Sequence, residues 1–375
     1  MAARQTAFKA KKLSGIPDSL QASLSRSRAA YHQVGTSGLR ISNPVFGGAH
    51  IGSSRWFPWV MNEEQAIPLL KAAYDRGINT WDTANIYSNG ESERIMGRAL
   101  RHYNIPRRKV VLMTKCYRVV CDEENYDPGS GVNFHNDLGN QSKDYVNSCG
   151  LSRSAIFNAV EASLERLGST YIDVLQIHRF DEEVSPEETM HALHDLVRVG
   201  KVRYLGASSM WAYQLAILQH TAEKYNLTKI ISMQHHYNLL YREEEREMIP
   251  YCRQSGVGSL AWSPLASGQL ARAPEKNGTT LRSQAHKTGA FYLNAEGENS
   301  DLILSRVWEI SQARGWPPSH VALAWLARRG SIPLIGFGSV ERIDEALDAR
   351  DKCLTLEEEA YLEEVYRPRA IEGHC

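Results

Sequence analysis

Four residues of types that transfer protons lie at or just after the ends of expected strands: Asp82, Tyr87, Lys115 and His178. A free phenol has a pKa of about 10, too high for easy proton exchange at neutral pH. A nearby ammonium group favours the phenolate and lowers that pKa, and a carboxylate keeps the ammonium charged in a dry site. A neutral imidazole can orient a carbonyl oxygen through a hydrogen bond. Together these groups suit the reduction of a carbonyl, with Tyr87 as the general acid.

The elements that position these residues follow one repeated pattern, in which a short apolar run precedes a longer amphipathic run. The pattern predicts eight strands, each followed sooner or later by a helix. The strands are expected at residues 45–48, 78–84, 110–114, 172–178, 204–208, 230–234, 258–262 and 332–336. Helices are expected at 62–77, 91–100, 152–167, 186–199, 211–225, 243–254 and 340–349.

The spacing of the strand ends indicates an α/β fold of the TIM-barrel class. From Asp82 onward, four intervals span 26 to 33 residues and two span 63 and 74. Eight such units predict a single-domain (β/α)8 barrel over residues 31–350. The two long intervals hold loops at about 118–150 and 266–300, both on the face where strands end and active sites lie. A doubly wound sheet alternates similarly, but no G-x-G-x-x-G follows the first strand.

The two ends of the chain are expected to lie outside the barrel. Residues 1–30 carry six basic side chains and one acidic side chain without a hydrophobic stripe, which predicts a disordered basic tail. A mitochondrial targeting segment is the alternative interpretation. Residues 351–375 are expected to form a C-terminal helix and tail.

Composition excludes several other classes of protein. The 375 residues carry 43 basic and 43 acidic side chains, and a net charge of zero argues against a general affinity for nucleic acid or anionic membranes. No apolar run is long enough to span a bilayer. None of the six cysteines lies in a C-x-x-C pair or at zinc-ligand spacing from a histidine, so no metal site is predicted. Scattered cysteines and the lack of a secretion signal favour a cytoplasmic protein.

Six segments, in order, resemble blocks of the aldo-keto reductase family, over about residues 35–350. They are GINTWDTANIYSNGESE (77–93), Thr114-Lys115, YIDVLQIH (171–178), GKVRYLGASS (200–209), QHHYN (234–238) and WSPL (262–265). The long 118–150 loop and the run after Tyr241 are similar to a branch of fungal reductases, some of them in natural-product pathways. The resemblance implies that Asp82, Tyr87, Lys115 and His178 are the catalytic tetrad.

The resemblance also implies an extended NADPH across the barrel mouth. Ser208 and Gln234 are expected to hold the nicotinamide carboxamide, and Ser209 stands beside them where the family more often has Asn. Trp262 is in the position of the aromatic residue that stacks on the nicotinamide. The loop that follows the pyrophosphate is expected to include Ser263, Leu265 and Gly268.

The segment from Gly338 to Glu345 resembles the adenosine end of the site. Arg342 is expected to pair with the 2′-phosphate, a natural task for a guanidinium, and Glu345 to accept from the adenine amino group. Ser339 and Arg342 together favour NADP over NAD.

Aromatic residues near the expected strand ends are candidates for the substrate pocket. Trp56 and Trp59 follow the first strand and are expected to line it, with Phe180 and Trp211 as further candidates. Such a pocket suggests a small-molecule carbonyl substrate that is bulky or aromatic. Two alternatives stay open: an NADPH-binding regulatory subunit with slow or no turnover, and an alcohol dehydrogenase that runs the reaction in reverse.

Overall fold

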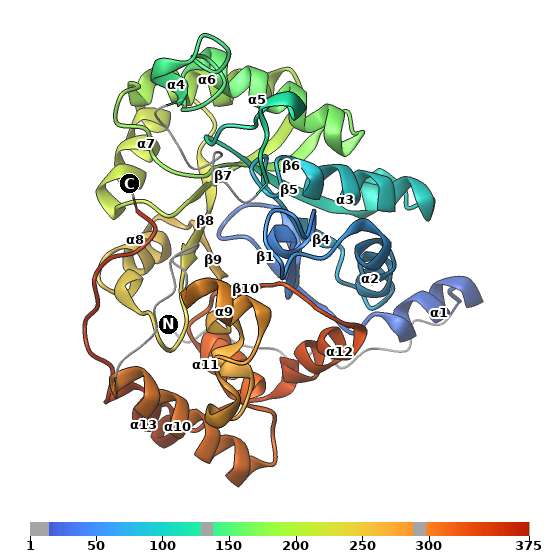
Figure 1. Ribbon diagram of the computed structural model, residues 1–375, viewed down its shortest axis with the longest axis vertical. Coiled ribbons are helices and arrows are strands. Elements are labelled where there is room, and N and C mark those ends of the chain that lie inside the picture. Colours follow the sequence, from blue (N-terminus) through green and yellow to red (C-terminus); the bar gives the residue numbers. More distant parts are fainter. Residues whose placement is uncertain (1–14, 129–137, 288–297, 375) are drawn as a thin grey trace.

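The computed structural model describes residues 15–128, 138–287 and 298–374. Eight parallel strands close into a barrel at the centre of the molecule, and helices surround it (Figure 1). In chain order these strands are β3 (Val45–Gly47), β4 (Thr80–Asp82), β5 (Val111–Cys116), β6 (Ile172–Ile177), β7 (Val202–Ser208), β8 (Ile230–His236), β9 (Gly258–Trp262) and β10 (Ile332–Ile335). The predicted (β/α)8 barrel is therefore confirmed.

The outer helices occur close to where the apolar periodicity predicts them. They are α2 (Glu63–Asp75), α3 (Glu91–His102), α5 (Arg153–Leu167), α6 (Pro186–Arg198), α7 (Ala212–Lys224), α8 (Met248–Ser255) and α12 (Val340–Asp348). Helix α5 illustrates the local signals. Ser152 accepts a hydrogen bond from the Ala155 N–H at its start, and Gly168 ends it in the left-handed region.

Alternation along the strands decides which side chains enter the barrel. Met113 of β5 and Val174 of β6 belong to the apolar cluster inside the barrel. Lys115 and Gln176, two residues further along each strand, therefore point to the same interior, nearer the strand ends. His178 comes directly after β6 on the same face. The strand order places these polar side chains above an apolar core.

An antiparallel hairpin that the sequence did not reveal closes the other end of the barrel. It consists of β1 (Ala30–Gln33) and β2 (Arg40–Asn43), and β3 begins two residues after β2. Val34 and Ile41 of this hairpin pack with the apolar residues inside the barrel. The open mouth is thus the end at which the strands finish.

The second half of the segment expected to be a disordered tail contains a helix. Residues 18–26 form helix α1 (Asp18–Arg26), which buries no side chain and projects from the barrel at the lower right of Figure 1. Arg28 forms ion pairs with Asp344 and Asp348 of α12, which fix the chain next to this helix. Residues 1–14 lie outside the described residues.

Both predicted loops follow strand ends and hold some helix. The first contains the short helix α4 (Leu138–Gln141), and its residues 129–137 lie outside the described ranges. The second contains α9 (Leu281–Lys287), and residues 288–297 lie outside the description. Two helices that the sequence analysis did not predict, α10 (Glu298–Arg314) and α11 (Pro318–Arg328), lead from this loop to β10.

The C-terminal segment returns to the barrel mouth after helix α13 (Leu356–Glu363), which begins with a capping box at Thr355. The chain then passes α8 and ends near α7 (Figure 1). The Tyr241 hydroxyl accepts a hydrogen bond of 2.9 Å from the Glu372 N–H, and His374 Nε2 lies 2.9 Å from Glu244 Oε1. These contacts hold the end of the chain beside the strand ends.

No helix within the described ranges is both long and apolar enough to cross a lipid bilayer.

Candidate active site

Three of the four predicted proton-transfer residues form a chain of hydrogen bonds at the ends of β4 and β5. Lys115 Nζ lies 2.6 Å from Asp82 Oδ2 and 3.4 Å from the phenolic oxygen of Tyr87, and it donates to the Thr83 carbonyl at 2.8 Å. Asp82 of β4 pairs with Met113 of β5. Lys115 lies two residues after Met113 along β5, and its side chain therefore points into the barrel as that of Met113 does. The barrel register therefore brings together residues 33 positions apart.

His178 lies across from Tyr87 at the end of β6. The two ring centroids are 6.1 Å apart, with an edge-to-face angle of 83°. The His178 main-chain N–H donates to the Cys116 carbonyl at 2.9 Å, which fixes the backbone at this point. The imidazole therefore faces the same volume as the phenol.

Burial controls the charge states of these groups. It raises the pKa of Tyr87, although Lys115 acts in the opposite direction. Lys115 lowers the pKa of Tyr87 as expected, but desolvation outweighs the ammonium, so the pKa is raised on balance. Burial disfavours charged Lys115, but Asp82 and Tyr87 together outweigh burial and the pKa of Lys115 is raised. Burial and then Arg179 hold the pKa of His178 well below its usual value. At neutral pH the site thus holds a phenol, an ammonium and a neutral imidazole.

A cavity of about 1110 Å³ opens above this chain of hydrogen bonds. Asp82, Tyr87 and His178 line one end of it, whereas Lys115 lies behind them and is 1% exposed. Ligand cavities commonly measure about 300–1000 Å³. This cavity therefore has room for a ligand larger than most small molecules.

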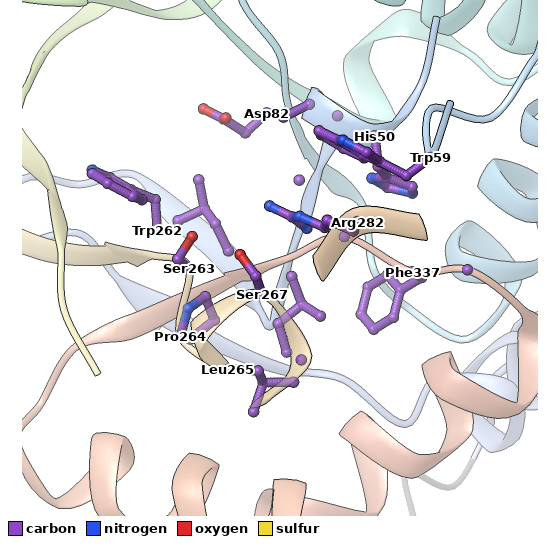
Figure 2. A pocket seen from close by; sticks show the side chains of 18 of the residues that line it. His50, Trp59, Asp82, Trp262, Ser263, Pro264, Leu265, Ser267, Arg282 and Phe337 are labelled. Carbon is purple, nitrogen blue, oxygen red and sulfur yellow. The ribbon is translucent and has the colours of Figure 1, made fainter. Parts of the chain in front are cut away.

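Trp262, at the end of β9, forms an aromatic wall of the cavity (Figure 2). Its ring stacks on His236 at a centroid distance of 4.1 Å, and His236 stacks on Tyr241 at 4.2 Å. The indole N–H donates to Ser209 Oγ at 2.9 Å. One face and one edge of Trp262 are thus held by protein, and the residue borders the cavity.

The three residues expected around the nicotinamide carboxamide lie in different surroundings. Ser208 and Gln234 line the cavity, whereas Ser209 is outside the lining and holds Trp262. Gln234 Nε2 donates to Asp82 Oδ1 and to Gln176 Oε1, both at 2.9 Å. Because both amide hydrogens are used, the amide oxygen is the part of Gln234 that can accept from a ligand.

The loop after β9 curls along the cavity floor. Ser263, Leu265 and Gly268, which are expected to follow the pyrophosphate, all line the cavity. Gly268 has a φ of 93°, and a Cβ atom added there would lie 2.6 Å from Nη2 of Arg272. A larger residue at 268 would therefore strain the backbone and displace Arg272.

The far end of the cavity is formed by α12 and the residues before it. Gly338, Arg342 and Glu345 line it, and Ser339 lies just outside the lining. Arg342 Nη1 lies 2.8 Å from Glu345 Oε2, and Glu345 also accepts a hydrogen bond from Ser319. Glu345, expected to accept from adenine, is therefore held by two protein groups in this structure.

Of the four aromatic candidates for the substrate pocket, two line the cavity. Trp56 and Trp59 both do so. Phe180 packs instead against the apolar core between barrel and helices. Trp211 is 38% exposed and contacts the His374 ring at a centroid distance of 4.8 Å. Neither residue lines this cavity, because Trp211 packs against the C-terminal segment and Phe180 packs against the core.

Several lining residues escaped the sequence analysis. Arg282 of α9 stacks on the Trp59 ring, with its guanidinium carbon 4.6 Å from the ring centroid, and faces the loop that contains Ser267 (Figure 2). Its ordinary-looking loop gave no signal in the sequence. Arg179 follows His178 directly and could have been inferred from that neighbour. Glu372 reaches the cavity only because the C-terminal segment folds back.

The polar groups of this cavity fit a phosphorylated dinucleotide. The Nε–H of Arg282 and the hydroxyl of Ser267 are buried, and neither has a hydrogen-bond partner among the described residues. Burial lowers the pKa of Arg282 to about 10, so the guanidinium remains charged at neutral pH. A guanidinium nitrogen and a hydroxyl that are buried without hydrogen-bond partners match the needs of a phosphate group. Flat Trp262 at one end and Arg342 at the other fit a long ligand.

Metal ligands do not gather in the part of the chain that the structure describes: it contains no group of three His, Cys, Asp or Glu side chains placed to bind a metal ion.

Comparison with known proteins agrees with this geometry. The model of the aldo/keto reductase family matches residues 45–367. An aldo-keto reductase of Fusarium vanettenii is 63% identical over 97% of this chain and 98% of its own length. Aldo-keto reductase dtxS3 of Metarhizium robertsii is 61% identical, with the same coverage. Versiconal hemiacetal acetate reductase of Aspergillus parasiticus is 48% identical over 91% of this chain and 98% of its own length.

These relatives confirm the resemblance to fungal reductases. Members of the family use nicotinamide cofactors, in agreement with the fit of the cavity. The chain therefore belongs to the aldo/keto reductase family and is an oxidoreductase that acts on carbonyl or alcohol groups.

Proposed function

We propose that this protein is an NADPH-dependent reductase that converts an aldehyde or ketone to an alcohol, with Tyr87 as the proton donor. The observation that carries the proposal is the buried chain Asp82–Lys115–Tyr87 at the cavity wall, with His178 across from the phenol. The bound nicotinamide supplies hydride to the carbonyl carbon.

The protein residues prepare the carbonyl oxygen for protonation. Tyr87 is a neutral phenol at neutral pH and can donate its proton to that oxygen. The Lys115 ammonium stabilises the phenolate that remains, and Asp82 keeps Lys115 charged. The neutral His178 can donate a hydrogen bond to the same oxygen and orient it. Proton transfer and the developing negative charge are thus served by preorganised groups in a water-poor site.

The preference for NADPH over NADH rests on the far end of the cavity. Arg342 lines it, and Arg272 lies close enough that the charge of Arg342, after burial, lowers the pKa of Arg272. Two guanidinium groups at one end suit a phosphate monoester, which carries about two negative charges at neutral pH. Trp56 and Trp59 in the lining support a bulky or aromatic substrate.

Tyr87→Phe tests the mechanism because it removes only the hydroxyl. We expect kcat for carbonyl reduction, followed by NADPH absorbance with a panel of aromatic aldehydes, to fall by about 10²–10⁴-fold. NADPH binding should be retained, because the ring remains. A Tyr87→Phe protein that reduces the panel as fast as wild type contradicts the mechanism. Tight NADPH binding without turnover by the wild type would instead indicate a regulatory subunit.

A further inference from the structure

The Asp82 carboxylate is held by two glutamines in addition to Lys115. Gln176 Nε2 donates to Asp82 Oδ1 at 2.8 Å, and Gln234 Nε2 donates to the same oxygen at 2.9 Å. Gln234 also donates to Gln176 Oε1 at 2.9 Å, which closes a triangle of side chains. Lys115 takes the other carboxylate oxygen. All four side chains are buried, and Gln176 is 0% exposed.

Chemistry fixes the orientation of both amides. An ionised carboxylate only accepts hydrogen bonds, so both glutamines must turn their NH₂ groups toward Asp82. Gln234 uses its second amide hydrogen on Gln176, whose oxygen accepts it. A buried carboxylate oxygen without a donor is costly, and Gln176 and Gln234 remove that cost for Oδ1.

The barrel register makes space for Gln176. Strand β6 pairs Gln176 with Lys115 of β5 on one side and with Gly206 of β7 on the other. A Cβ atom added at Gly206 would lie 2.8 Å from Cγ of Gln176. The glycine thus lets the Gln176 side chain reach across the barrel to Asp82.

Gln176 differs from Gln234 in its access to ligands. Gln234 and Asp82 line the cavity, whereas Gln176 and Lys115 do not. Any contribution of Gln176 to the reaction must therefore pass through its hydrogen-bond partners, the Asp82 carboxylate and the Gln234 amide. Lys115 and Tyr87 are the titratable groups that interact with that carboxylate from neighbouring elements.

We propose that Gln176 is a positioning residue for proton transfer: its amide holds the Asp82 carboxylate so that Lys115 stays charged and aimed at Tyr87. This inference rests on the proposed role of Tyr87 as the proton donor. No ligand contact is required of Gln176, so its loss should lower kcat and leave cofactor binding almost unchanged.

The experiment compares Gln176→Met, which keeps the length of the side chain but removes the amide, with the wild type. We expect kcat to fall by about tenfold or more, a part of the roughly 10²–10⁴-fold that general acid catalysis supplies. The dissociation constant of NADPH, from quenching of protein fluorescence, should change less than about twofold. The kcat–pH profile should also change at its acid end, because the Asp82 carboxylate loses one of its hydrogen-bond donors.

Gln176→Glu supplies a second, isosteric variant. A protonated glutamic acid can donate to Asp82 as the amide does, whereas an ionised one repels it. Its kcat relative to wild type should therefore recover as the pH falls, and that of Gln176→Met should not. Gln219→Met is the matched control, because Gln219 is also buried but, among the residues that the structure describes, bonds only the main chain of Ile230. It should lower stability without this change in the pH profile.

Wild-type kcat and pH profile in Gln176→Met, or an equal loss of kcat in Gln219→Met, would overturn the inference. The absence of acid recovery in Gln176→Glu would also count against it. These outcomes are separate from failure of the proposed function, which Tyr87→Phe reports. If Tyr87→Phe is inactive while Gln176→Met and Gln176→Glu behave as wild type, only the role of Gln176 is wrong.

Discussion

Lys115 and Asp82 form a buried ion pair of 2.6 Å whose side chains are 0% and 3% exposed. Such a pair costs desolvation energy on both sides, and replacement by apolar residues is often neutral or stabilising. Its position within 3.4 Å of the Tyr87 hydroxyl gives it a chemical use that an apolar pair would lack. The proposed proton transfer therefore explains the pair better than a contribution to stability does.

Removal of one partner should harm both stability and catalysis. We expect Lys115→Met to destabilise the protein by about 3–5 kcal/mol, because it leaves a buried carboxylate unpaired. Chemical denaturation measures this loss, and kcat should fall as well. The double variant Lys115→Met/Asp82→Asn should regain part of the stability but none of the activity. Equal stability of the single and double variants would argue against the pair.

The direction of the Tyr87 pKa shift determines the pH dependence of reduction. Burial raises this pKa above its usual value, so the phenol keeps its proton through pH 7 to 9. Reduction, which needs the protonated form, should therefore lose kcat only when the pH rises past the ordinary tyrosine range of about 10. Stopped-flow kcat from pH 6 to 10 tests this. An alkaline loss of kcat centred near pH 7.5 would show that Lys115 outweighs burial.

Two arginines should affect cofactor binding in different ways. Arg342→Met should weaken NADPH binding by about 10–100-fold and leave NADH binding unchanged. The expected loss corresponds to the charge-assisted hydrogen bonds between Arg342 and the 2′-phosphate, which contribute about 1.5–3 kcal/mol. Arg282 faces the loop expected to follow the pyrophosphate, which both cofactors share. Arg282→Met should therefore weaken both equally. Fluorescence titration with each cofactor measures the four affinities, and equal losses in Arg342→Met would contradict its assignment.

The Glu372 carboxylate should bias the cavity against anionic substrates. Glu372 lines the cavity; neutral His236 lies 3.9 Å from its carboxylate, and the charge of Arg369 also acts on it. Glu372→Gln should raise kcat/KM for 4-carboxybenzaldehyde by about tenfold relative to benzaldehyde, because it removes a like charge. Glu364→Gln, outside the lining and paired with Arg306, is the control and should leave this ratio unchanged.

Buried His50 should make the fold less stable in mild acid. Burial and then Arg282 lower the pKa of His50 to about 4, so the unfolded chain binds a proton near pH 6.5 that the folded state does not. The free energy of unfolding therefore decreases as the pH falls through 6.5, by about 2 kcal/mol between pH 7 and 5. Urea denaturation of the wild type and of His50→Gln at both pH values isolates the part of this stability loss that is due to His50. An equal decline in both proteins would exclude it.

The sequence predicted the site best where local periodicity and barrel topology act together. Asp82, Lys115 and His178 follow apolar runs, and parallel strands carry their ends to one mouth. The same alternation places Gln176 two residues before His178 on the interior face, so the sequence contained a signal for it. Gln176 was not predicted, because only residues at the strand ends were considered as candidates for the site.

Residues on long connections could not be found in this way. Arg282 comes from a loop of ordinary composition, and Glu372 reaches the mouth through contacts of the C-terminal segment with Tyr241. Trp211 and Phe180 lie near strand ends in sequence, but His374 and the core contact them. Such placements depend on packing between distant segments, which no local pattern encodes.

By itself the sequence predicted the barrel, because period and spacing are local properties of the chain, and its resemblance to the aldo-keto reductases implied the family and the four candidate proton-transfer residues. Only the tertiary structure decided the charge states and partners of those residues. Burial overrode Lys115 at Tyr87, and the register of β4, β5, β6 and β8 brought Gln176 and Gln234 onto Asp82. Desolvation and hydrogen-bond geometry exist only once distant segments have packed, so these features follow from the fold.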